Sequence, residues 1–241
     1  MSEFGNIIKK LINDVDTLED KNIKEAAKII YSCMKNEGIL HVFATGHSHM
    51  FSEELFYRAG GLVQIDPILI PPLMQHEGAI TSTKLERVSG MALKIYQELD
   101  LKKGEPFIIV SNSGINSVPV EMANICKENG HPVIVITSMD MTKKVEPRNN
   151  LGLHLYELGD VVIDNHAPLG DGVIKFSYGQ SGSCSSILGN FIAQRLVLEV
   201  IDLYNQDDMI PPIYLSANLP GGDEHNALLY KKYQKRIKAL K

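Results

Sequence analysis

The sequence of 241 residues has few cysteines, no long hydrophobic run and no excess of positive charge. Its three cysteines, Cys33, Cys126 and Cys184, are odd in number and widely spaced, which argues against a disulfide framework and a zinc site. No apolar run reaches the ~20 residues that a membrane span needs, and the first residues lack the features of a signal peptide. We therefore expect a cytoplasmic protein that does not associate with membranes.

The charge balance is slightly acidic. The chain has 24 Lys and Arg against 29 Asp and Glu, which gives a formal net charge of -5. This balance argues against a general nucleic-acid binder. It does not exclude an anionic small ligand, because a local pocket can bind phosphate on an acidic protein. With 44% hydrophobic residues, the chain is long enough to bury a full core.

Short apolar runs alternate with segments of helical periodicity. Strands are predicted near 39–44, 62–65, 68–70, 107–110, 133–137 and 161–164, and helices near 7–18, 23–34, 48–59, 85–99, 117–130 and 187–203. Alternating strands and helices predict an α/β fold with a parallel sheet, and uniformly apolar strands predict helices on both faces. We expect three regions: N-terminal helices over 1–37, a core domain over 38–205, and a C-terminal tail and helix over 206–241.

Two polar loops follow predicted strands. The first is Thr45-Gly46-His47-Ser48-His49, and the second runs from Ser111 to Ser117 with the sequence Ser-Asn-Ser-Gly-Ile-Asn-Ser. Open α/β sheets bind ligands at the carboxyl ends of their strands, and hydroxyls beside a helix N-terminus suit an anion. Taken singly, either loop is better explained by helix capping, but two serine-containing loops after consecutive buried strands favour a binding site. Neither matches a nucleotide-binding motif, and hydroxyls and amides without lysine favour a small phosphate monoester.

The order strand–Gly46-x-Ser48–helix, then strand–Ser111-x-Ser113-Gly114-x-x-Ser117–helix, resembles the sugar isomerase (SIS) phosphosugar-binding domain over roughly residues 20–205. The whole chain resembles uncharacterised bacterial SIS proteins related to phosphoheptose isomerases. The resemblance implies an αβα sandwich of three layers with a central, flavodoxin-like parallel sheet. It also implies that Ser111, Ser113 and Ser117 bind phosphate, and that Ser48 contacts phosphate or sugar hydroxyls. The predicted binding set is completed by Gly46, His47, Asn112 and Gly114.

Aldose–ketose isomerisation needs a base that moves a proton, and often an acid that opens the sugar ring. The stretch Ser52-Glu53-Glu54-Leu55 resembles the Ala-Glu-Glu-Leu stretch of phosphoheptose isomerases, whose second glutamate is catalytic, and this implies Glu54. Here the Glu53-Glu54 pair lies about one helical turn closer to the serine loop. An ungapped comparison therefore places Arg58, and not Glu54, at the position of the catalytic glutamate. The alternative is that Glu54 is an exposed helix carboxylate.

Two further segments carry candidate acid and base groups. His76-Glu77-Gly78 resembles the His-Gly-Asp region of arabinose 5-phosphate isomerases, which implicates His76 or Glu77; the alternative is a loop ion pair. The phosphoheptose isomerases use a histidine on the long C-terminal helix, where this chain has Gln194. His225, in a tail that follows two glycines, is a candidate replacement on a lid, and the alternative is a solvent-exposed histidine.

His47 and His49 flank Ser48, but their spacing is poor support for a metal site, and we predict none. His166 is a candidate for the cleft, and Asp171 is interpreted as a turn residue.

The leading hypothesis is a sugar-phosphate isomerase without a cofactor. The alternatives are a lyase of the N-acetylmuramic acid 6-phosphate etherase type and a non-catalytic phosphosugar sensor. The predicted partners are a small-molecule sugar phosphate and further copies of the chain, as a homodimer or homotetramer formed through the N-terminal helices.

Overall fold

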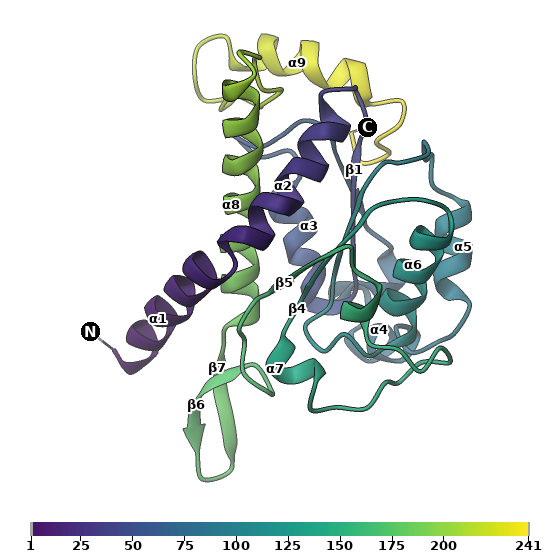
Figure 1. Ribbon diagram of the computed structural model, residues 1–241, viewed down its shortest axis with the longest axis vertical. Helices are drawn as coiled ribbons and strands as arrows, with labels where there is room; N and C mark the ends of the chain where they lie inside the picture. The colour runs from purple at the N-terminus through teal and green to yellow at the C-terminus, as the bar shows by residue number, and fades with distance from the viewer. Residues whose placement is uncertain (1, 241) are drawn as a thin grey trace.

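The computed structural model describes residues 2–240 and has a five-stranded parallel sheet at its centre (Figure 1). The strand order is β2-β1-β3-β4-β5, with every neighbouring pair parallel. The order changes direction between β1 and β3, which is where ligands bind in open sheets of this kind. The strands are β1 (Leu40–Ala44), β2 (Ile65–Ile68), β3 (Phe107–Val110), β4 (Val133–Thr137) and β5 (Val161–Asp164).

Helices cover both faces of the sheet, as the apolar strands predicted (Figure 1). Val42 and Ile108 point to one face, and Phe43 and Ile109 point to the other, so β1 and β3 are buried on both sides. The α/β fold with three layers is therefore confirmed. The first face carries α1 (Glu3–Leu18), α2 (Asp20–Met34), α3 (Met50–Leu55) and α8 (Ser185–Gln206), and the second carries α4 (Ala79–Leu85), α5 (Met91–Gln97) and α6 (Ser117–Glu128).

The predicted helix over 85–99 is shorter in the structure, where α4 ends at Leu85 and only α5, from Met91 to Gln97, falls within that range. Gly90 has a left-handed φ of +81°, which interrupts the helix between α4 and α5. The Glu121 carboxylate fixes this break, because it accepts hydrogen bonds from the Ser89 hydroxyl and the Gly90 amide. In place of the two strand candidates at 62–65 and 68–70, the structure has one strand, β2, which runs through Asp66 and Pro67.

A β-hairpin that the sequence did not predict extends from the body at the bottom of Figure 1. It consists of β6 (Gly172–Phe176) and β7 (Gly179–Ser183), which pair antiparallel and separately from the main sheet. Its second strand reads Gly-Gln-Ser-Gly-Ser, so the apolar alternation that identifies a strand is missing. The remaining short elements are α7 (Met139–Thr142) and the 3₁₀ turns η1 (Gly46–His49), η2 (Pro71–Leu73), η3 (Gln75–Glu77) and η4 (Leu155–Leu158).

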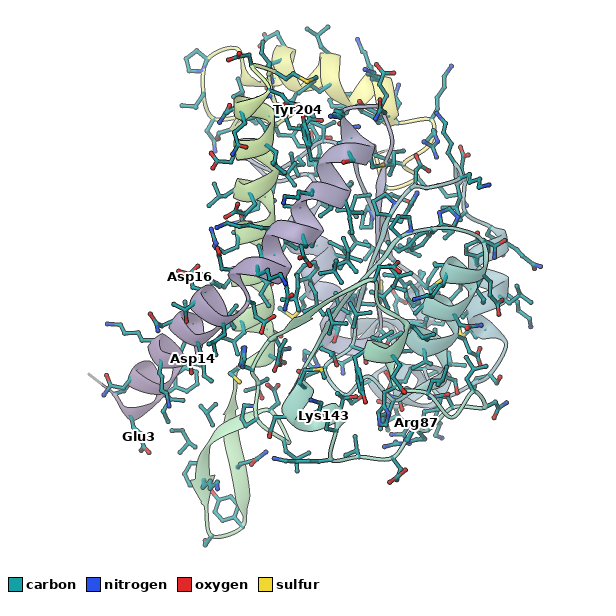
Figure 2. The ribbon with its side chains drawn as sticks, viewed as in Figure 1. Glu3, Asp14, Asp16, Arg87, Lys143 and Tyr204 are labelled. Carbon is teal, nitrogen blue, oxygen red and sulfur yellow. The ribbon has the colours of Figure 1, made fainter. Side chains whose placement is uncertain are left out.

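The C-terminal segment packs at the amino edge of the sheet. Helix α9 (Gly222–Tyr233) and the residues after it bury Tyr233 and Ile237 against Ile39 and Val63, which precede β1 and β2. Figure 2 shows Tyr204 at this end of the molecule, with Arg87 and Lys143 at the opposite end. Within residues 2–240, no helix has the length and apolar character that a membrane crossing demands.

A buried charged network ties this segment to the sheet. The Arg236 guanidinium donates two hydrogen bonds of 2.7 Å to the Glu105 carboxylate. His41 lies between two carboxylates, with Nδ1 2.9 Å from Asp66 and Nε2 3.2 Å from Glu105. Burial opposes the charge of His41, but the hydrogen bonds to Asp66 and Glu105 outweigh it and raise the pKa of the imidazole.

Candidate functional site

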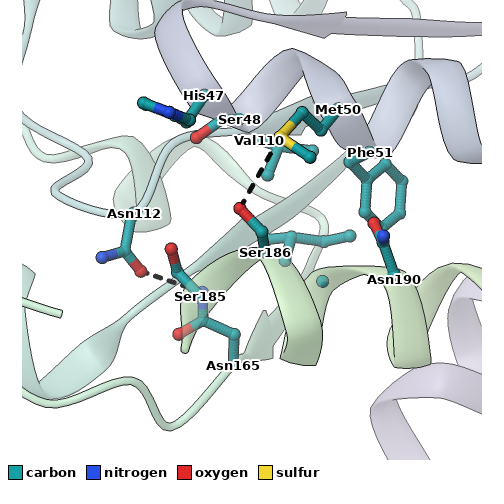
Figure 3. A pocket seen from close by; sticks show the side chains of 12 residues that line it. His47, Ser48, Met50, Phe51, Val110, Asn112, Asn165, Ser185, Ser186 and Asn190 are labelled. Carbon is teal, nitrogen blue, oxygen red and sulfur yellow. Dashed lines mark hydrogen bonds between the residues drawn. The ribbon is translucent and has the colours of Figure 1, made fainter. Parts of the chain in front are cut away.

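A pocket opens at the carboxyl edge of the sheet, between η1, the loops after β3 and β5, and the first turns of α8 (Figure 3). It measures about 350 Å³, including space open to solvent. Most of the polar groups on its wall are hydroxyls and amides, which are neutral hydrogen-bonding groups. The polar lining residues are His47, Ser48, Asn112, Asn165, Ser185, Ser186 and Asn190.

The first polar loop turns sharply at Gly46, where φ is +57°. This left-handed conformation lets the chain leave β1 and enter η1 at once. The Ser48 amide donates to the Thr45 carbonyl at 3.2 Å, which closes the turn. The Ser48 hydroxyl lines the pocket and has no hydrogen-bond partner among residues 2–240, so it is available to a ligand.

The second polar loop divides its three serines between two roles. The Ser111 hydroxyl accepts a hydrogen bond from the Gly114 amide at 3.2 Å, and the Ser117 hydroxyl donates to the Arg87 carbonyl at 3.1 Å. Both therefore hold the loop in shape. In the part of the chain described, the Ser113 hydroxyl has no hydrogen-bond partner. Of the three serines, Ser113 is the one whose hydroxyl makes no internal hydrogen bond, although only its neighbour Asn112, and not Ser113 itself, is among the residues that line the pocket.

Gly114 explains why this loop is so compact. Its φ is +62°, and a Cβ atom at this position would lie 3.0 Å from the hydroxyls of Thr137 and Thr142. A larger residue would therefore be strained by its backbone and crowded by β4 and α7. The predicted glycine is needed for the close approach of the loop to its neighbours.

Two asparagines join the loops after β3 and β5. The Asn165 side-chain amide donates to the Asn112 side-chain oxygen at 2.9 Å, and the Ser138 amide donates to the Asn112 carbonyl at 3.1 Å. Both side chains line the pocket. Asn112 was among the predicted residues, whereas Asn165 was not; its position directly after β5 was the available signal.

The first turn of α8 forms the opposite wall. The Asp171 carboxylate accepts hydrogen bonds from the Ser185 amide at 2.7 Å and the Ser185 hydroxyl at 2.9 Å. Asp171 precedes the hairpin in the chain and caps the N-terminus of α8, which follows it. The sequence had suggested only a role in a turn. Within residues 2–240, the buried Oδ1 of Asn190 on the next turn has no partner.

Glu54 lies outside the pocket wall. Its carboxylate accepts hydrogen bonds from Gln194 of α8 at 2.7 Å and from Arg58 at 3.0 Å. The side chains of α3 that do line the pocket are Met50 and Phe51, one turn nearer its amino end. Glu54 therefore borders the site, and its partner on α8 is a glutamine.

His76 and Glu77 lie on η3, outside the pocket lining. Both are exposed, and their side chains are 3.5 Å apart, as in the loop ion pair considered for them. The His76 ring lies 6.4 Å from the ring of His49, which places η3 against the first polar loop.

His225 lies at the other end of the molecule. Its Nε2 is 3.1 Å from the Ile213 carbonyl, in a segment that pairs with Leu62 ahead of β2. Helix α9 therefore stands at the amino edge of the sheet, and within one chain the tail does not close over the pocket.

Glu86 was not predicted, and it connects both polar loops. Its carboxylate accepts hydrogen bonds from the Thr45 hydroxyl at 3.0 Å and from the Asn116 side chain at 2.9 Å. It therefore spans the crevice between the ends of β1 and β3. Burial raises the pKa of Glu86, against the opposing effects of the Thr45 hydrogen bond, Arg87 and Arg148. No sequence signal distinguished it, because it fell inside a predicted helix.

No group of three His, Cys, Asp or Glu residues in the described chain is arranged to hold a metal ion. His49 is buried, and its Nε2 lies 3.8 Å from Glu53. His166 instead lies 3.1 Å from the buried Glu19, whose hydrogen bond raises the pKa of the histidine. Within residues 2–240, His47 is the only titratable side chain that lines the pocket.

The sheet order and the pocket beside its switch point define an open α/β protein of the kind that binds ligands at the carboxyl edge of the sheet. The chain belongs to the SIS domain family, whose model matches residues 3–138. A UPF0309 protein of Halalkalibacterium halodurans is 41% identical over 100% of this chain and 97% of its own length. A UPF0309 protein of Listeria innocua is 39% identical over 100% and 98%.

The fold is also similar to a solved phosphoheptose isomerase from Francisella tularensis. The two structures superpose with a TM-score of 0.50, over 84% of this chain and 100% of the other. Their sequences are 15% identical, so the likeness is one of fold.

Proposed function

We propose that this protein binds a sugar phosphate and isomerises it between its aldose and ketose forms. The observation that supports the proposal is the gathering of hydroxyls and amides from the loops after β1, β3 and β5 at one pocket. Membership of the SIS domain family and the fold of a phosphoheptose isomerase agree with this ligand class. The ligand would be bound without a metal or nucleotide cofactor.

The proposed phosphate anchor is the pair of free hydroxyls on Ser48 and Ser113. Each would donate a hydrogen bond to a phosphate oxygen, and a bond to a charged acceptor contributes more than a neutral one. Ser117 would act indirectly, because its hydroxyl already donates to the Arg87 carbonyl, whereas the Ser111 hydroxyl accepts from Gly114 and would still have its own proton to donate to the phosphate. The side-chain amides of Asn112 and Asn190 would contact sugar hydroxyls.

The proposed isomerisation passes through an enediol. A base removes the proton on C2 of the aldose and returns it to C1, while the hydroxyl proton moves from O2 to O1. Glu54 is the carboxylate that we assign this role, once it leaves Gln194 and Arg58. Glu77 is the alternative base. His47 on the pocket wall, or His76 beside it, would protonate the ring oxygen during ring opening.

A non-catalytic phosphosugar sensor is the second candidate. It is favoured by the pocket wall itself, which carries no carboxylate within residues 2–240. Both an isomerase and an etherase-type lyase need one at the reacting carbon. Product analysis separates the three: an isomeric sugar phosphate marks the isomerase, lactate marks the lyase, and binding without turnover marks the sensor.

The test begins with thermal shifts over a panel of five- to seven-carbon sugar phosphates. A ligand at 100 times its dissociation constant stabilises the fold by about 2.7 kcal/mol, which raises the melting temperature measurably. Calorimetry then compares the best ligand across variants. Ser48→Ala and Ser113→Ala are each expected to weaken binding by roughly 10-fold to 100-fold.

Ser177→Ala in the hairpin turn is the matched control, because it removes a hydroxyl far from the two polar loops. Unchanged affinity in Ser113→Ala would contradict the anchor. No thermal shift with any phosphosugar would overturn the ligand class. The same proposal includes assembly as a homodimer or homotetramer.

A further inference from the structure

A second pocket, the β2-edge pocket, lies beside the open edge of β2, between that strand, α5 and the C-terminal segment that follows α9. It measures about 820 Å³, including space open to solvent, which is enough for a small organic molecule. It shares no lining residue with the pocket at the carboxyl edge of the sheet. A ligand bound here would therefore not overlap the phosphosugar proposed above.

Apolar side chains make up much of the wall of the β2-edge pocket. Ile68 of β2 and Ile95 of α5 line it, and both are buried in the core between the sheet and its second layer of helices. Ile70 and Leu99 extend this apolar surface and pack partly against the same core. Because removing such a surface from water is favourable, it suits the hydrocarbon part of a ligand.

The cationic groups of the wall are already held by partners in this chain. Nη1 and Nη2 of Arg236 donate to the Glu105 carboxylate at 2.7 Å, and Nη2 also donates to the Asp100 carbonyl at 2.8 Å. Arg236 Nε is buried and lies 3.7 Å from the Asp100 carboxylate. Lys238 donates to the Glu98 carbonyl at 2.8 Å. Both cations are therefore committed to internal contacts.

The carboxylates of the wall are less completely paired. Asp66 lines the pocket and is only 8% exposed. Its Oδ2 lies 2.9 Å from His41 Nδ1, whereas its Oδ1 has no hydrogen-bond partner within residues 2–240. In the same part of the chain, no donor is bonded to the Glu98 carboxylate. A nearly buried acceptor without a donor is unfavourable, so Oδ1 of Asp66 is where the wall would stabilise a ligand that donates.

The charges around the pocket do not cancel. The network behind the wall is neutral when His41 is protonated, because it then holds two cations and two carboxylates, from His41, Arg236, Asp66 and Glu105. This form is favoured since, against the effect of burial, the hydrogen bonds to both carboxylates raise the pKa of His41. The remaining lining residues add two carboxylates and one ammonium, from Glu98, Asp100 and Lys238. The excess of one negative charge favours a ligand with a single positive charge.

We propose that the β2-edge pocket binds a small primary amine with an apolar body. The ammonium donates to Asp66 Oδ1 and is attracted by Glu98. The hydrocarbon body covers Ile68 and Ile95. A carboxylate or phosphate on the ligand would meet cations that are already engaged, and it would be repelled by Glu98 and Asp100. The ligand is therefore a plain amine, and neither an amino acid nor a phosphosugar.

The first test is calorimetry at neutral pH with three compounds that share one hydrocarbon body. Isopentylamine carries a positive charge, isopentyl alcohol carries none, and the free amino acid leucine adds a carboxylate to the amine. The amine is expected to bind, and the other two compounds should bind more weakly by about 10-fold or more. No binding of the amine, or equal binding of the alcohol or the amino acid, would overturn the proposal.

The second test removes the carboxylates. Asp66→Asn keeps the shape of the side chain and should weaken the binding of isopentylamine by roughly 10-fold to 100-fold. Because Asp66 also contacts His41, a second variant leaves that contact intact. Glu98→Gln combined with Asp100→Asn removes two charges from the wall and should weaken binding by about 2-fold to 10-fold.

Asp223→Asn combined with Glu224→Gln on α9 is the matched control. It removes the same two charges from exposed positions that do not line the pocket, and it should leave the affinity for isopentylamine unchanged. Wild-type affinity in the variant of Glu98 and Asp100, or in a folded Asp66→Asn, would contradict the site.

The third test locates the amine by NMR of methyl groups. The resonances of Ile68, Ile95 and Leu99 should shift during titration with isopentylamine. Val110 and Ile136 line the other pocket, and their resonances should stay in place. Shifts confined to Val110 and Ile136 would place the amine at the carboxyl edge and overturn the assignment. Because all three tests use an amine, their failure leaves the proposed phosphosugar untouched, and failure of phosphosugar binding leaves this site untouched.

Discussion

Glu86 holds the two polar loops together through Thr45 and Asn116 while lying outside the pocket wall. Burial raises the pKa of its carboxyl in the folded protein above the value in the unfolded chain. The proton is therefore held more tightly in the folded state. Its contribution to stability is complete below the unfolded pKa of about 4.3 and is lost as the pH rises through the folded pKa.

Glu86→Gln should remove this dependence, since an amide does not titrate. We expect the unfolding free energy of Glu86→Gln to improve relative to that of the wild type as the pH rises through this window. Urea denaturation at a series of pH values measures the difference. Glu77→Gln, at an exposed position of η3, is the control and should show no such trend. A flat difference for Glu86→Gln would contradict the argument.

At the scale of single residues, the sequence identified the kinds of side chain at the site better than their roles. Ser111, Ser113 and Ser117 are equivalent in the motif. In the structure, however, the hydroxyls of Ser111 and Ser117 form hydrogen bonds with backbone groups, and the hydroxyl of Ser113 does not. That difference depends on the Arg87 carbonyl and on loop closure, which spacing along the chain does not encode. Glu86 escaped prediction because its partners lie 41 and 30 residues away.

At the scale of elements, α8 depends on a cap supplied from before the hairpin. Asp171 has φ +68°, a conformation that Asp and Asn tolerate better than other side chains. Asp171→Ala removes the acceptor for the first turn of α8 and should lower the unfolding free energy by about 1–2 kcal/mol. Asp171→Asn keeps an acceptor and the backbone preference, and should lose less.

Urea unfolding of the two variants tests this expectation. Equal stability of Asp171→Ala and the wild type would show that the cap contributes nothing.

The sequence placed α8 at 187–203, close to its observed limits, because a long apolar pattern is a strong signal. The hairpin before it was missed because glycine and serine carry no such pattern.

At the scale of the whole molecule, the Arg236 network joins the C-terminal segment to strands formed far earlier in the chain. Burial alone would raise the pKa of Glu105, but Arg236, His41 and two backbone amides lower it well below its usual range. Arg236→Leu leaves the buried carboxylate without its main partner. It should lower the unfolding free energy by about 3 kcal/mol or more.

Chemical denaturation of Arg236→Leu beside Lys235→Leu, an exposed neighbour, measures this effect. A loss no larger than that of the control would contradict it.

The alternation of strands and helices predicted the layered architecture at this scale. It did not predict which end of the sheet the tail covers, because that choice depends on Tyr233 and Ile237 meeting Ile39 and Val63.

Pro67 determines how the sheet ends at β2. The Leu40 amide donates to the Gln64 carbonyl, so even-numbered residues of β2 face β1 and Pro67 faces the open side. The outer rim of the sheet thus lacks an amide proton at its centre, and a strand from another molecule cannot extend the ladder there without losing a hydrogen bond. At high concentration in a crowded cell, this imino acid should protect the protein against fibril-like stacking.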